Sequence, residues 1–282
     1  MEIARPGLLI AGKGAAEEMS GEVASGESSA MSGKRTAAGT VEVRRCRGLE
    51  EFEECMKIEV AVWGESDLHV PLPMYVVAAE TGGQVLGAFF QGRMIGFTMA
   101  LAGVKDGRPI LHSHMTAVVL EFRDRGVGRR LKLLQREDAL ARGIQLVEWT
   151  FDPLEIKNAH FNLVRLGAVA RRYIPNCYGI TSSPLHGGLP TDRLMAEWEL
   201  ESDRVKEAVS RQPTGVSKKV SRTDDVRIFV PADVARMREA EPEKAARVQR
   251  EICEQFQKWF AKGYAAVGFE LGGEGGRYIL ER

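Results

Sequence analysis

The chain has 282 residues, of which 44% are hydrophobic and 28% are charged, with 39 basic and 39 acidic side chains. These values are ordinary for a globular protein, and the zero formal net charge argues against a nucleic-acid or membrane partner. No apolar run is long enough to cross a bilayer. The four cysteines are dispersed without a metal-binding spacing, so we expect reduced thiols, no bound metal and a cytoplasmic protein.

Residues 1–40 are rich in Gly, Ala, Ser and Glu and follow neither a helical nor a strand period, so we predict a disordered segment. Regular structure is predicted from Val41, with a strand over 41–45. A helix should follow, because apolar residues recur at 49, 52, 56 and 60. The segment around Pro71 and Pro73 is predicted to be a loop.

Two strands over 85–91 and 93–102 predict a hairpin turning at Gly92, and a further strand is predicted over 110–120. Because side chains alternate along a strand, His112, His114 and Thr116 are predicted to share one face. Imidazole titrates near neutral pH, so either histidine is a candidate general base. The alternative is a pair of strand histidines that only form structural hydrogen bonds.

The stretch 117–140 joins the end of this strand to a basic glycine turn and a helix. The first turn of a helix has N–H groups without intrahelical partners and the positive end of the helix dipole, which together suit a phosphate. Gly126 and Gly128 remove side chains that would hold a ligand away. We predict an anion-binding turn here, the plainer alternative being a glycine connection with solvated arginines. The cations around the turn are Arg123, Arg125, Arg129 and Arg130.

Two other phosphate-binding motifs are excluded. The chain has no Gly-x-x-x-x-Gly-Lys string followed by Ser or Thr, as a Walker loop requires. Leu131 stands where the third glycine of a dinucleotide fingerprint belongs.

The next predicted strand, 146–151, carries the carboxylate of Glu148 among mostly apolar neighbours. Burial disfavours a charged carboxylate, so Glu148 is a candidate base toward a substrate ammonium. It is equally well explained by an ion pair with Arg165 or Arg171. A helix over 156–166 follows, and a further strand is predicted over 192–200, where apolar residues alternate.

Two motifs in order resemble those of the GNAT superfamily of acyl-CoA-dependent N-acetyltransferases. Arg-x-x-Gly-x-Gly at 123–128 is similar to its motif A, and the sequences at 158–161 and 165–168 are similar to its motif B helix. The resemblance covers about residues 41–200 and implies an α/β (α+β) fold, a mixed twisted sheet flanked by helices. It implies that 171–174 and 177–180 are the last paired strands of that sheet. It implies that the fourth and fifth strands splay to admit the pantetheine arm of acetyl-CoA, the co-substrate. The implied CoA-binding residues are Val118, Arg123, Arg125, Gly126, Val127, Gly128, Arg129 and Asn158.

One position departs from the family pattern. Many GNAT members have a tyrosine four residues before the glycine of the Leu-Gly pair, where it protonates the CoA thiolate, and here that position is Leu163. Tyr173, Tyr178 or solvent would have to replace it, although each tyrosine also suits a half-buried strand position. Asn158 has a similar alternative as a helix cap.

The resemblance implies transfer of an acetyl or other short acyl group to the amine of a small molecule or peptide by direct attack. The candidate catalytic residues are Glu148, His114, His112 and Tyr173. The alternative is a GNAT-like module that binds CoA or another metabolite without turnover.

Residues 201–282 exceed a minimal GNAT domain. A polar segment with one short helix is predicted over 201–225, then a strand over 226–230, two helices and two strands around Gly272. Because about 80 residues barely support a separate core, we expect an α+β extension packed on the first domain. A homodimer is left open.

Overall fold

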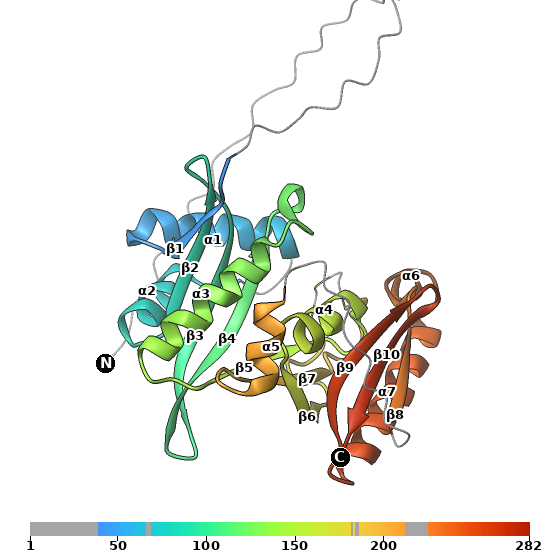
Figure 1. Cartoon of the computed structure of the whole chain (residues 1–282). Helices are drawn as coiled ribbons and strands as arrows, with labels where there is room; N and C mark the ends of the chain where they lie inside the picture. The colour runs from blue at the N-terminus through green and yellow to red at the C-terminus, as the bar shows by residue number, and fades with distance from the viewer. Residues whose placement is uncertain (1–38, 66–68, 182, 184–185, 212–224) are drawn as a thin grey trace, which may run out of the picture. The chain divides into compact units, whose positions relative to one another are not determined.

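A mixed ten-stranded sheet runs through the computed structural model, which describes residues 39–65, 69–181, 183, 186–211 and 225–282 (Figure 1). Its strand order is β1-β2-β3-β4-β5-β7-β6-β9-β10-β8. Helices flank the sheet, so the expected α/β class is confirmed. The predicted disorder of residues 1–38 and the middle of the 201–225 segment lie outside the described residues.

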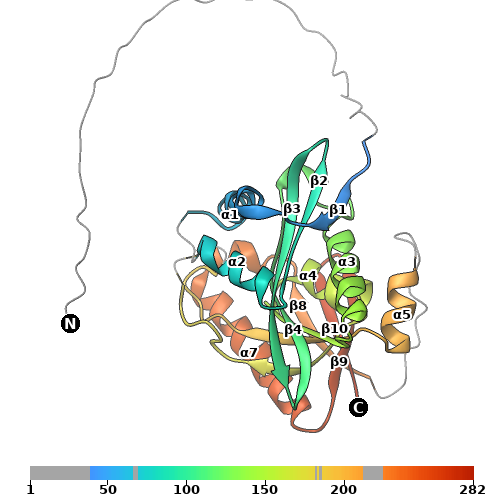
Figure 2. The ribbon, with the colours of Figure 1, turned by 90° about the vertical axis from the view of Figure 1, so that its left-hand side faces the viewer.

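Strands β1 to β4 form an antiparallel meander, and β5 then joins β4 in parallel. Helices α1 and α2 cover one face of these strands, and α3 covers the other (Figure 2). The elements are β1 (Glu42–Arg45), α1 (Gly48–Trp63), α2 (Leu72–Glu80), β2 (Gln84–Phe90), β3 (Arg93–Lys105), β4 (Arg108–Val118), the 3-10 turn η1 (Leu120–Phe122), α3 (Val127–Ala141) and β5 (Leu146–Phe151).

The chain next forms the strand pair β6 and β7, with β7 inserted antiparallel between β5 and β6. The helix predicted over 156–166 is present, but its second half is a π-helical turn. These elements are α4 (Ile156–His160), the π turn η2 (Phe161–Arg165), β6 (Val169–Ile174), β7 (Arg193–Glu199) and α5 (Asp203–Ser210).

Two local predictions are wrong. The segment with Pro71 and Pro73 forms the start of α2, because proline lacks only an N–H that the first helical turn does not need. The segment 177–180 is a turn, not a strand. Asn176 and Gly179 both take positive φ there, which breaks the extended conformation, and the partner of β6 is β7 instead.

The C-terminal residues continue the same sheet. Strand β9 meets β6 at Ala170 and Ala266, and β10 and β8 follow outward. Phe256 packs against Tyr173 and Tyr278 with ring centroids 5.6 and 4.9 Å apart, within the hydrophobic core that also contains β5 and β7. The elements are β8 (Val226–Pro231), α6 (Val234–Ala240), α7 (Pro242–Phe260), β9 (Ala265–Gly272) and β10 (Gly275–Glu281).

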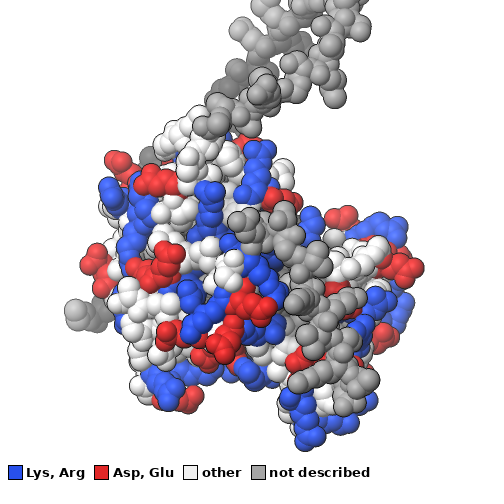
Figure 3. All heavy atoms as spheres, in the orientation of Figure 1, with Lys and Arg blue, Asp and Glu red and all other residues white. Residues whose placement is uncertain are grey.

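Charges of both signs are interspersed on the face shown in Figure 3, as the balanced composition predicts. Buried charge also joins the extension to the rest of the sheet, because Arg238 of α6 donates to Asp152, just after β5, at 2.7 Å. No helix in the described part of the chain has the length and apolar character needed to cross a membrane.

Candidate functional site

The parallel strands β4 and β5 stop pairing partway along their length. Their register runs from Ile110 opposite Leu146 to His112 opposite Glu148 and ends there, although both strands continue. We call this end point the β4–β5 fork. Beyond it, the facing edges of the two strands do not hydrogen-bond to each other, so their backbone groups are available to a third component.

A bulge in β4 adjoins the fork. The register between β3 and β4 shifts between Met99 and Ala100, which leaves His114 as an extra residue without a partner on β3. An extra residue bends and twists its strand, which accounts for the divergence of β4 from β5.

Because of the bulge, the residues of β4 are distributed over the two faces of the sheet differently from the sequence prediction. The rings of His112 and His114 lie 6.3 Å apart, as expected for one face. Thr116 is opposite Thr98 and bonds to it at 2.8 Å, so it faces the other side, with Ser113. The prediction that Thr116 shares the histidine face is wrong because the extra residue reverses the alternation.

Glu148 shares the histidine face, because it is the in-register partner of His112. It is 5% exposed and forms an ion pair with Lys105, at the end of β3. The alternative of an ion pair is thus confirmed with Lys105 as the partner in place of the two arginines considered, and Arg171 bonds Glu197. Partial withdrawal from water lowers the pKa values of His112 and His114, which keeps both imidazoles neutral and able to accept a proton at pH 7.

The same face holds a second buried carboxylate that the sequence did not reveal. Glu59 of α1 is 2% exposed and accepts hydrogen bonds from the Tyr75 hydroxyl at 2.8 Å and the Val70 N–H at 2.9 Å. The Tyr75 hydroxyl also lies 3.6 Å from the sulfur of Met115 on β4. The position of Glu59 in the sequence did not indicate burial, since a glutamate in an amphipathic helix is usually solvated.

The two candidate tyrosines lie in different places. The Tyr178 hydroxyl bonds Thr150 Oγ1 at 2.8 Å, and Thr150 is two residues beyond Glu148 on β5, so Tyr178 lies on the histidine face. Tyr173 is on β6, separated from β5 by β7, and its hydroxyl donates to Asp192 at 2.7 Å. The structure therefore does not bring Tyr173 to the fork.

The glycine turn opens α3 as predicted. Gly126 has φ of 78° at the N-cap, and the first backbone bond of the helix runs from Arg130 N–H to Gly126 O. The N–H groups of residues 127–129 precede that bond. A Cβ added at Gly126 would meet nothing within 4 Å, and at Gly128 only a Val118 methyl at 4.0 Å, so a ligand has room to contact the backbone.

The side chains around the turn differ from one another. Arg123 and Arg125 are exposed, although Arg123 Nε also donates to Val118 O at 3.1 Å. Arg129 turns away and donates to the Val209 carbonyl of α5 at 2.6 Å, so its predicted phosphate contact would have to come from its backbone N–H. Asn158 is exposed on α4, whose N-cap is Glu155, which removes the helix-cap alternative.

The α3 face of the fork carries an unexpected cation. Lys132 is 3% exposed, and its ammonium donates to Ser113 Oγ at 2.7 Å and to Gln135 Oε1 at 3.0 Å. The same nitrogen lies 4.1 Å from the centroid of the Trp149 ring. Burial lowers the pKa of Lys132 to about 7.

Two residues of the motif B segment complete this face. Asn162 is buried, and its Oδ1 accepts from Trp149 Nε1 at 3.3 Å, while its Nδ2 has no hydrogen-bond partner among the described residues. Leu163, at the position of the family tyrosine, is fully buried in the hydrophobic core.

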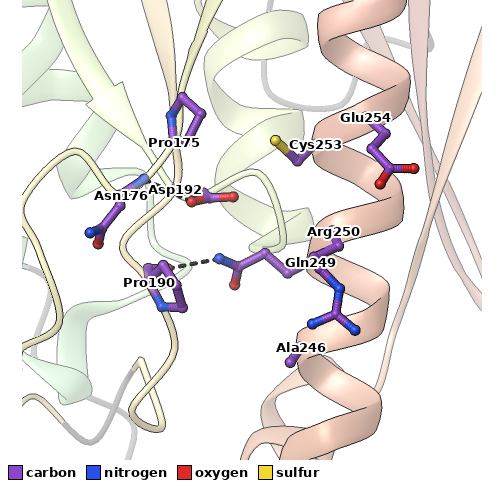
Figure 4. Close-up of a pocket in the computed structure, with 9 residues that line it drawn as sticks. All are labelled: Pro175, Asn176, Pro190, Asp192, Ala246, Gln249, Arg250, Cys253 and Glu254. Carbon is purple, nitrogen blue, oxygen red and sulfur yellow. Dashed lines mark hydrogen bonds between the residues drawn. The ribbon is translucent and has the colours of Figure 1, made fainter.

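A separate hollow lies between the β6–β7 connection and α7 (Figure 4). Gln249 donates to Pro190 O at 2.8 Å, and Asp192 accepts from Tyr173 and from the Asn176 N–H. These lining groups are thus already engaged with protein partners. The hollow is separated from the fork by β7, so it does not belong to the same site.

No protein-family model and no curated protein match this sequence. Among solved structures, the ribosomal-protein-S18-alanine N-acetyltransferase from Escherichia coli is 13% identical, with 58% of this chain and 96% of that one covered and a TM-score of 0.47. Naa50 from Arabidopsis thaliana, in complex with the bisubstrate analogue CoA-Ac-MVNAL, is 12% identical, with coverages of 56% and 97% and a TM-score of 0.46. The yncA protein from Salmonella typhimurium with its cofactor acetyl-CoA is 17% identical, with coverages of 57% and 95% and a TM-score of 0.46.

The first of these proteins is named as an N-acetyltransferase, and the other two are described in complex with a bisubstrate analogue or with acetyl-CoA. At such identities the likeness concerns the fold, so any activity must be derived from the residues of this chain.

Proposed function

We propose that this protein transfers a short acyl group, acetyl in the first instance, from acyl-CoA to an amine by direct attack of the amine on the thioester. The observation that carries the proposal is the β4–β5 fork. Its strands cease to pair directly after His112 and Glu148, and β4 leads from there to the glycine turn that begins α3. One strand thus connects a site for a reacting carbonyl with a site for phosphates.

Acyl-CoA carries both a thioester carbonyl and phosphates, the two groups that these sites would bind. The backbone N–H groups at the start of α3, with Arg123 and Arg125, would hold its phosphates. The open space at Gly126 and Gly128 satisfies the steric requirement for such contact. Unpaired N–H groups of β4 beyond His112 would polarise the thioester carbonyl.

The histidine face supplies the groups for the amine. An attacking amine must be neutral, and His112 and His114 have lowered pKa values, so their neutral rings can take its proton. Buried Glu148, in its ion pair with Lys105, places a carboxylate beside them to which a substrate amine can donate a hydrogen bond. No cysteine is needed as a nucleophile. We include residues 201–282 in the same unit, since they continue its sheet.

A second candidate function is binding of CoA or a related metabolite without turnover. The specific observation in its favour is Leu163, which has no proton to give at the position of the family acid. The two candidates share the phosphate site and differ only in chemistry.

The first experiment is calorimetric titration of acetyl-CoA into the full chain and into an Arg123→Ala, Gly128→Asp double variant. Asp at the second helical position is compatible with the helix dipole, so the variant should fold, while its carboxylate repels phosphate. We expect binding to weaken at least about tenfold, since a charge-assisted hydrogen bond is worth about 1.5–3 kcal/mol. An Arg277→Ala, Gly273→Asp variant makes the same charge change at the exposed β9–β10 turn and should bind normally.

Absence of acetyl-CoA binding by the folded wild type would refute the transferase and the CoA-binding form of the second function. Binding without acetylation of any member of an amine and peptide panel would favour the module without turnover. Binding with acetylation would establish the transferase.

A further inference from the structure

The fork has a buried cation on its α3 face for which the fold has no evident need. Ser113 and Trp149 are the first residues of β4 and β5 after the pairing ends, and the Lys132 ammonium contacts both. Lys132 therefore lies at the point where the two strands separate. Glu148 and His112, the last paired residues, face the opposite side.

The surroundings of Lys132 make its charge costly. Its neighbours from β4, β5 and α3 are a hydroxyl, an indole ring and a neutral amide. No carboxylate among the described residues forms an ion pair with it. The pKa of His112 is lowered mainly by burial, and the charge of Lys132 adds a smaller effect in the same direction. A buried ammonium without a counter-ion destabilises a fold, and such groups are concentrated at functional sites.

We propose that Lys132 is the acid that protonates the sulfur leaving the acyl group, an inference that rests on the proposed acyl transfer. As the amine nitrogen bonds to the acyl carbon, the carbon–sulfur bond breaks and its electron pair goes to sulfur. The Lys132 ammonium gives one proton to that sulfur, forming the thiol, and the resulting neutral amine takes a proton back from water. The proton of the attacking nitrogen passes to the base on the histidine face.

Three observations support this role. Of the positions considered for an acid from sequence, Leu163 has no proton to give, Tyr173 lies away from the fork, and Tyr178 lies on the opposite, histidine face, where burial raises its pKa. The pKa of about 7 lets Lys132 both give and regain a proton near neutral pH. Buried Asn162 accepts a hydrogen bond from the Trp149 indole, and its Nδ2 has no partner among the described residues, which marks this face as one with an unused hydrogen-bond donor.

The test measures the protein with the product CoA, so it does not depend on turnover. The thiol of bound CoA is titrated by the ultraviolet absorbance of its thiolate, in the wild type and in Lys132→Met. Lys132 and the bound thiol titrate as one coupled pair, so part of the thiolate absorbance of the wild type should develop in a first step near pH 7, at least about one pH unit below the single step of the variant. Lys206→Met, at an exposed position on α5, is the matched control and should behave as the wild type.

Lys132→Met should fold, because an apolar side chain of similar length replaces a buried charge. A measurement on the wild type alone avoids any reliance on that variant. In a spectrum of ¹⁵N-labelled lysine side chains, the Lys132 resonance should shift on addition of CoA and titrate at a new pH.

The outcomes separate the inference from the proposed function. If CoA binds but its thiol titrates alike in wild type and Lys132→Met, Lys132 is not the acid, while the transferase proposal stands. If folded wild type binds neither CoA nor acetyl-CoA, the proposed function fails and the inference fails with it. A lowered thiol pKa together with loss of acyl transfer at neutral pH in Lys132→Met would support both.

Discussion

Replacement of Lys132 by Met should change how the stability of the protein depends on pH. The pKa of Lys132 falls from 10.5 to about 7 on folding, because the side chain is fully buried. The unfolded chain therefore binds more protons than the folded one between these values, and the free energy of unfolding should rise with pH across that window. Below about pH 7 both states are protonated and the full penalty applies.

The magnitude follows from the same shift. One pKa unit corresponds to about 1.4 kcal/mol, so the penalty at pH 7 is about 4 kcal/mol and has fallen to about 2 kcal/mol at pH 9. The wild type should thus gain about 2 kcal/mol between these pH values in addition to changes from other groups. Lys132→Met lacks this gain, because methionine does not titrate. Other titrating groups are common to both proteins and cancel in the difference.

Urea unfolding of both proteins at pH 7, 8 and 9, followed by circular dichroism, measures this difference. We expect Lys132→Met to be the more stable protein at pH 7, with its advantage shrinking as the pH rises. Lys206→Met should follow the wild type at every pH. A constant difference between wild type and Lys132→Met would show that Lys132 is not held in a perturbed state, and the reasoning about its burial would be wrong.

Three further results are expected. Glu148→Gln should lower the rate of acyl transfer about a hundredfold with little change in acetyl-CoA affinity, because it removes charge from the amine side only. Steady-state kinetics would measure the rate and calorimetry the affinity. Equal losses of rate and affinity would contradict this expectation. In a measurement of the acyl-transfer rate against pH, the loss of rate on the acidic side should have its midpoint below about pH 6.5, because desolvation lowers the pKa values of His112 and His114. A midpoint above that pH would exclude both histidines as the base. Arg238→Ala should lower the free energy of unfolding by about 3 kcal/mol, measured by urea unfolding, because it leaves Asp152 without its buried partner. A decrease below about 1 kcal/mol would mean that the ion pair is effectively solvated.

The sequence predicted the order of the main strands and helices well, because hydrophobic period and glycine turns are local signals. The strand–turn–helix unit at 117–140 is the clearest case, since each of its parts has its own signature. The helix after Pro71 was missed because prolines in a first turn resemble those of a loop.

The site was less predictable, since its chemistry depends on contacts between distant residues. Lys105 lies 43 residues from Glu148, so no local pattern linked them. The bulge at His114 leaves no mark in the alternation of residues, yet it moves Thr116 to the other face. Lys132 occupies a helix position where a lysine is usually solvated, and only the packing of Ser113 and Trp149 shows that it is buried.

The C-terminal extension changes which backbone edges the sheet presents to other chains. Without β9, strand β6 would end the sheet and offer its free N–H and C=O groups to any neighbouring strand. With the extension in place, the final edge on this side among the described residues is β8, which ends at Pro231, a residue with no N–H to donate, and carries the charged Arg227. Strands β9, β10 and β8 thereby protect the β6 edge against unwanted strand addition, so we expect any homodimer to use a surface other than β6.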